Sequence, residues 1–153
     1  MMTSDKSKRI EAVCKKANLY GAINRFDAAE KNLMAALDEF DRDNKLLNLL
    51  GTMCHRQSRF EEALDFFAEA SKKGNHHGLE ATINLAITLC DLGRYDDARN
   101  AFTVLGQKAH FLPVAGPASN ALAATHLKLA KTYISQQLRT EAIAEIKKAL
   151  KLD

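Results

Sequence analysis

The chain has 153 residues, of which 46% are hydrophobic and 27% charged, and its formal net charge is only +3. This composition is typical of an ordered, folded unit rather than a disordered tail, and so small a positive charge gives little support to general nucleic-acid binding. The apolar stretches are a few residues long and the amino end lacks an apolar signal core, so we expect no membrane span and a cytoplasmic location.

Cysteine usage agrees with that location. The three cysteines, Cys14, Cys54 and Cys90, are odd in number and lie inside helical segments. Such a pattern indicates reduced thiols rather than a disulfide framework.

A short phrase recurs along the chain, each time around an alanine. It reads NRFDAAEKNL, SRFEEALDFF, GRYDDARNAF and LRTEAIAEIK, around Ala29, Ala63, Ala98 and Ala142. The separations are 34, 35 and 44 residues. A period near 34 is typical of a helical repeat array, so we predict an all-α fold built from antiparallel helix pairs.

The first two repeats each consist of two predicted helices joined by a short turn. Residues 10–43 run from about Ile10 through the turn NRF to Phe40. Residues 44–78 begin with LLNLLGTMCHRQ, whose apolar residues recur at helical spacing and form a broad face. The turn SRF precedes a second helix, FEEALDFFAEASKKG, whose final Lys-Lys-Gly predicts a basic last turn and a left-handed stop.

Two further repeats complete a single predicted domain over residues 5–152. Residues 79–112 repeat the pattern as ATINLAITLCDLGRY and DDARNAFTVLGQKA, and residues 118–152 repeat it again. Between them the insert HFLPVAGPAS, at 110–119, contains two prolines and a glycine that stop one helix before the next begins. The insert is either a longer turn or an apolar loop that contacts a ligand or a second copy.

Small residues fall where paired helices must approach closely. They are Gly51, Ala86 and Ala130 on the first helices, and the four recurrent alanines on the second helices. A large side chain at these positions would push the helix axes beyond the roughly 8 to 10 Å at which such helices pack.

The phrase LLGTMCHRQSRFEEALDFFAEA resembles the tetratricopeptide repeat. That pattern places a large apolar residue, Leu-Gly, an aromatic residue before x-x-Ala, Phe and Ala in order, and it is matched here by Leu47, Leu50, Gly51, Phe60, Ala63, Phe67 and Ala70. The resemblance implies a right-handed superhelix, or α-solenoid, of antiparallel helix pairs that binds other proteins. Two departures are that Asp41, Asn75 and His110 replace the usual closing prolines, and that Lys16 replaces a leucine, as expected of a solvent-facing end repeat.

Motifs that indicate catalysis or metal binding are sparse. The sequence has no Gly-rich phosphate loop, nucleophile elbow or paired-carboxylate constellation. Cys54 and His55 are adjacent, so they point about 100° apart on a helix and do not ligate one metal together. His76 and His77 are expected to be surface histidines in the short link after the second repeat rather than metal ligands. We therefore expect no enzyme activity, no cofactor and no metal.

The remaining candidate site is a surface rather than a motif. Stacked helical hairpins related by a small rotation form a concave groove lined by one face of each first helix. In the tetratricopeptide phase, the candidate partner-binding residues on that face are Asn18, Asn48, Thr52, His55, Arg56, Ile83, Ile87, Asp91, Leu127 and Lys131. The polar members suit the polar groups of an extended or helical peptide, and the apolar members suit its side chains. Alternatively, Ile83 and Leu127 only pack between neighbouring helices.

Two functions follow from this reasoning. The first is a noncatalytic protein-protein interaction adaptor that binds a protein or peptide segment in the groove. The alternative is a self-assembly module of a larger protein, because the chain stops at KKALKLD without a capping helix, which would leave Ile143, Ile146 and Leu150 uncovered or buried in a homo-oligomer. RNA binding is opposed by Glu11, Glu80 and Asp91 in the expected groove.

Overall fold

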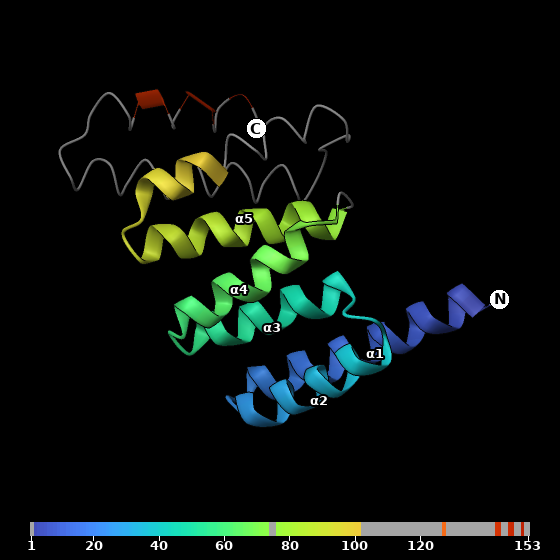
Figure 1. The fold of residues 1–153 in the computed structure, drawn as a ribbon. Helices are drawn as coiled ribbons and strands as arrows, with labels where there is room; N and C mark the ends of the chain where they lie inside the picture. The colour runs from blue at the N-terminus through green and yellow to red at the C-terminus, as the bar shows by residue number, and fades with distance from the viewer. Residues whose placement is uncertain are drawn as a thin grey trace. The chain divides into compact units, whose positions relative to one another are not determined.

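A computed structural model of the chain describes residues 2–73 and 76–101, together with the single positions 127, 143, 144, 147, 148 and 151. Every regular element among these residues is an α-helix. The chain divides into two compact units, Met1–Ala81 and Thr82–Asp153, each of which is considered by itself. The described helices are α1 (Met2–Ala22), α2 (Phe26–Glu39), α3 (Asn44–Arg56), α4 (Phe60–Ser71) and α5 (His76–Asp91), and residues 95–101 are also helical (Figure 1).

The all-α class and the helix pairs of the first two repeats are confirmed, but the predicted start of the first helix was wrong. Helix α1 begins at Met2, not near Ile10. The segment before Ile10 is polar and so lacks a strong apolar period, yet it contains no proline or glycine to interrupt a helix, and Asp5 stands in the favourable first turn. The Lys-Lys-Gly stop is tested only in part: α4 ends at Ser71 with Lys72 as its C-cap, and Gly74 lies outside the described residues.

The same turn closes the first helix of each of three repeats. One residue adopts the left-handed conformation, with φ of 59° at Asn24, 60° at Ser58 and 75° at Gly93. The next residue donates its backbone N–H to the carbonyl five positions earlier, over 2.8–2.9 Å: Arg25 to Tyr20, Arg59 to Cys54 and Arg94 to Leu89. These are the bonds of a Schellman motif, which satisfies carbonyls that a helix end otherwise leaves unpaired.

The core of the first unit lies between its two helix pairs. Helix α1 packs on α2, α3 packs on α4, and α2 and α1 both contact α3 (Figure 1). Fully or almost fully buried aliphatic side chains fill this space, among them Leu33, Leu37, Leu46, Leu47 and Leu50. Burial of such side chains supplies most of the driving force for folding.

The predicted close approach at small residues is confirmed wherever the structure describes it. Ala29, Ala63, Ala86 and Ala98 have no exposed surface. A Cβ atom placed on Gly51 would lie only 2.5 Å from Cε1 of Phe67, so the ring of α4 occupies the space that a side chain on α3 would need. Ala130 and Ala142 lie outside the described residues.

The continuous described segment of the second unit comprises the later part of α5, the turn after it and the helical residues 95–101. Ala86, Leu89, Cys90 and Ala98 are buried, as an inner helix face requires. Thr88 is also buried, and its hydroxyl donates to the carbonyl of Asn84 at 2.8 Å, which satisfies the polar group within the helix.

The three cysteines are free thiols and all are buried, as the sequence predicted for reduced cysteines. Burial raises the pKa of Cys54 to about 11 and also raises the pKa of Cys14. Within the described residues, no helix is both long enough and apolar enough to cross a membrane, and no cluster of three potential metal ligands occurs.

Candidate partner-binding surface

Helix α3 carries four of the predicted binding residues, which differ in burial and in the contacts that they make. Asn48 is buried, with 7% of its surface exposed, and Thr52 is half-buried. The Thr52 hydroxyl donates to the carbonyl of Asn48 at 3.0 Å, so part of its hydrogen-bonding capacity is used inside the helix. His55 is half-buried with its ring edge against Phe60, at a centroid distance of 5.1 Å.

Arg56 connects α3 with the end of the preceding helix pair. Its Nη2 donates to the carbonyl of Gly21 at 3.0 Å, and its guanidinium lies 5.0 Å from the ring centroid of Phe26. Gly21 leaves the space for this arginine, because a Cβ there would lie 2.9 Å from Nη1 of Arg56. Contacts between the two repeats therefore account for the position of the Arg56 side chain without a bound ligand.

The other predicted residues range from buried to exposed. On α5, Ile83 is buried, Ile87 is half-buried and Asp91 is exposed, while Asn18 on α1 is exposed. Leu127 has 45% of its surface exposed, and Lys131 lies outside the described residues. The side chains accessible to a partner are therefore those of Asn18, Thr52, His55, Arg56, Ile87, Asp91 and Leu127, at least in part.

Charged side chains at the α3–α4 turn fix the second helix pair to the first. Arg59 donates to Glu30 of α2 at 2.7 Å and to Glu62 of its own helix at 2.9 Å. Gln57 also donates to Glu30, at 2.5 Å. Hydrogen bonding to Arg59 lowers the pKa of Glu62 below its ordinary value. Because these groups serve helix docking, they are poor candidates for contact with a ligand.

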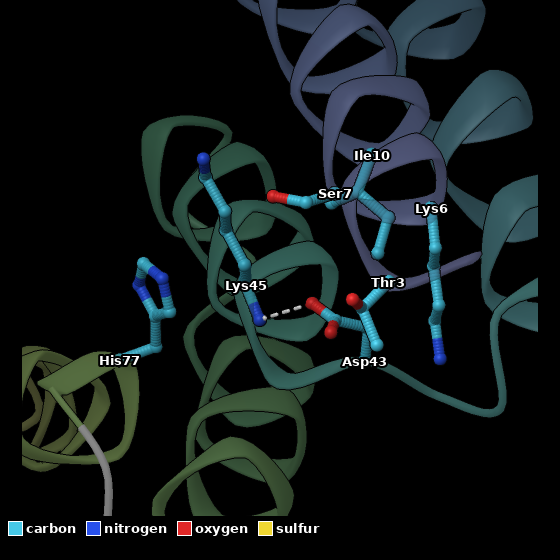
Figure 2. A pocket seen from close by; sticks show the side chains of 7 residues that line it. All are labelled: Thr3, Lys6, Ser7, Ile10, Asp43, Lys45 and His77. Atoms are coloured by element: carbon cyan, nitrogen blue, oxygen red, sulfur yellow. Dashed lines mark hydrogen bonds between the residues drawn. The ribbon is translucent and has the colours of Figure 1, made fainter. Parts of the chain in front are cut away.

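The structure also contains a pocket that the sequence did not predict (Figure 2). It has a volume of about 240 Å³ and is lined by Thr3, Lys6, Ser7, Ile10, Asp43, Lys45 and His77. The residues come from α1, from the start of α3 with its N-cap Asp43, and from α5. The sequence did not predict the wall formed by α1, because this helix was expected to begin near Ile10. The signal available in the sequence was the spacing 3, 6, 7 and 10, which places these residues on one helix face.

Helix pairs of about 34 residues, closed by one repeated turn and stacked through small residues, define an α-solenoid repeat protein. The chain belongs to the tetratricopeptide repeat family, whose members match it at residues 14–76, 79–102 and 123–153. Proteins of this family act in protein interaction and as scaffolds, and this chain has such a role. No curated protein matches the chain by sequence.

Solved structures of other proteins share the fold. A crystal structure of MamA has a TM-score of 0.70 and 20% sequence identity, covering 94% of this chain and 77% of that chain. A further MamA crystal structure has a TM-score of 0.69 and 19% identity, covering 97% and 75%. The crystal structure of BtubC from P. vanneervenii has a TM-score of 0.76 and 19% identity, covering 94% of this chain and 61% of that one. At these identities the likeness establishes the fold alone.

Proposed function

We propose that the protein is a noncatalytic adaptor that binds a peptide or protein segment along the surface formed by its first helices. One observation carries this proposal: the pocket of about 240 Å³ is lined by α1, α3 with its N-cap, and α5, which are all first helices of their pairs, and by no residue of α2 or α4. A hollow on this side matches the concave face that stacked hairpins generate, and extended segments bind in such grooves.

Burial of the individual side chains guides which predicted residues we propose as direct contacts. Asn18, Thr52, His55, Ile87, Asp91 and Leu127 are accessible at least in part and stay in the proposed contact set, together with Lys131 from the sequence. Asn48 and Ile83 are buried and would act by supporting neighbouring side chains. Arg56 would act mainly by holding two repeats in place.

Site-specific photo-crosslinking in cells of the source organism tests the proposal. A benzoylphenylalanine residue is introduced at Asn18 or Asp91, which are exposed on first helices, and at Lys31 or Asp65, which are exposed on second helices. We expect a protein crosslink from the first pair and none from the second. Crosslinks from Lys31 and Asp65 alone would move the binding site to the other face and overturn the proposal.

A second candidate function, self-assembly, is favoured by a specific observation in the second unit. Ile143, on which the sequence-based self-assembly hypothesis depends, has 53% of its surface exposed and is therefore accessible to a second copy. The exposed lysines nearby in sequence, Lys147, Lys148 and Lys151, would form a polar rim around such a contact.

A further inference from the structure

The pocket between α1, α3 and α5 combines cationic and hydroxyl groups over an apolar wall. Figure 2 shows the side chains of Lys6 and Lys45 on opposite sides, with the Ser7 hydroxyl directed toward the Lys45 side. His77 approaches from α5, and Ile10, which is 6% exposed, lines the pocket beside Ser7. The pocket is therefore lined by several hydrogen-bond donors and by one aliphatic side chain.

Several arginines of the first unit form ion pairs away from this pocket: Arg9 with Glu39, Arg42 with Glu69, and Arg59 with Glu30 and Glu62. By contrast, the ammonium groups of Lys6 and Lys45 have no carboxylate partner among the described residues, although Lys45 is half-buried. Unpaired ammonium groups at a partly closed surface gain from an incoming anion.

Asp43 is the acidic residue in the pocket lining, and its carboxylate is already engaged. Its Oδ1 accepts the backbone N–H of Lys45 at 2.9 Å, which caps α3 (Figure 2). A second carboxylate, Glu80, lies 3.8 Å from Nδ1 of His77 and so faces that ring rather than lining the pocket.

We propose that this pocket binds an acidic stretch of a peptide partner, with separate Asp or Glu carboxylates directed to Lys45 and to Lys6. This proposal rests on the proposed function, because it takes the ligand to be a peptide bound along the surface formed by the first helices of the pairs. Ser7 and Thr3 donate hydroxyl hydrogen bonds to the same carboxylates, and Ile10 packs against their methylene groups. A carboxylate suits the pocket better than a phosphate, because the pocket has no arginine fork and Asp43 repels a dianion more strongly.

Fluorescence anisotropy of the full chain with a labelled hexaglutamate peptide tests this inference, with hexaglutamine as the uncharged probe. The pocket variant is Lys6→Gln with Lys45→Gln. The matched control is Lys8→Gln with Lys31→Gln, which removes the same net charge at exposed positions outside the pocket. We expect the pocket variant to raise the Kd for hexaglutamate roughly tenfold, and the control to raise it by less than about twofold.

Equal weakening by both variants would show that only general charge attraction is involved, and equal binding of hexaglutamine would show that the pocket does not recognise carboxylates. Either result would overturn the proposal. Amide NMR shifts of Ser7 and Lys45 on adding hexaglutamate provide an independent readout, and their absence would overturn it as well. This test uses no natural partner, so a negative result would overturn the acidic-peptide proposal without contradicting the adaptor function. A negative crosslinking result would contradict the adaptor function without changing the measured binding of hexaglutamate.

Discussion

At the scale of single residues, the turns that join paired helices require one left-handed position each, and the chain fills it with different residue types. Asn24, Ser58 and Gly93 all have φ near 60–75°. This conformation costs an L-residue roughly 1–2 kcal/mol, less for asparagine, and costs glycine almost nothing. The turns are therefore not equally stable, and Ser58 is the most strained of the three by residue type.

Substitutions at Ser58 and Gly93 should have opposite effects. We expect Gly93→Ala to lower the free energy of unfolding by about 1 kcal/mol and Ser58→Gly to raise it by up to about 1 kcal/mol. The Gly93 effect would be conformational strain alone, because a Cβ there meets no atom within 4 Å. Urea unfolding followed by circular dichroism measures both changes. A Gly93→Ala variant as stable as the parent would contradict the expectation.

The buried thiol of Cys54 should make stability fall at high pH. Its pKa is raised from the ordinary 9.0 to about 11, so between these values the unfolded thiol has lost its proton and the folded thiol has kept it. The unfolded state then binds fewer protons, and the free energy of unfolding decreases as the pH rises from about 9 to about 11. Urea midpoints across this range should fall more steeply for the parent than for Cys54→Ala. Parallel curves would argue against a thiol that stays protonated.

At the scale of elements, the pair α3–α4 shows how the repeat specifies its own packing. The ring of Phe67 occupies the space above Gly51, and Ala63 on the same helix has no exposed surface. Arg59 then fixes the pair to α2 through Glu30. Apolar contact sets the distance between the two helices, and the ionic contact, which is partly exposed, adds a smaller directional contribution.

Overpacking this pair should destabilise the protein. We expect Gly51→Leu or Ala63→Leu to reduce the free energy of unfolding by about 1 to 3 kcal/mol or more, because neither site has room for the added carbons. The matched control is Ala68→Leu, on the exposed side of α4, which should change stability by no more than about 0.5 kcal/mol. If thermal melts of the buried variants coincide with the control, the assigned helix-pair contact is wrong.

At the scale of the whole molecule, the exposed apolar residues bear on the choice between an adaptor and a self-assembly module. Leu19 on α1 is 70% exposed, Ile23 in the turn after α1 is 65% exposed, and Ile143 is 53% exposed. Exposed apolar residues that lie together on a surface mark places where a partner or a second copy binds.

Self-association should respond to Ile143 in particular. We expect concentration-dependent association of the chain, with Ile143→Lys shifting it toward monomer while circular dichroism stays helical. Sedimentation equilibrium measures the shift, and Leu127→Lys, at another exposed apolar position, is the control that should leave association unchanged. A parent chain that is strictly monomeric at high micromolar concentration would remove the self-assembly function and leave the adaptor.

The sequence by itself determined the repeat and its internal packing. The spacing of Ala29, Ala63 and Ala98 predicted paired helices, the residues NRF, SRF and GRY predicted the turns, and Gly51 predicted the close contact that Phe67 makes. These features are local or periodic. They depend on side-chain size and on the helix period, and both can be inferred from a short stretch of sequence.

Only the tertiary structure decided which polar residues of the first helices are available to a partner. The sequence assigned Asn48, Thr52 and Arg56 alike to an open surface, yet Asn48 is buried, Thr52 bonds within its helix, and Arg56 packs on the preceding pair. The pocket around Lys6 and Lys45 escaped prediction for the same reason. Exposure depends on how neighbouring helices cover each face, and a site shared by three helices about 30 to 40 residues apart has no continuous signature in the sequence.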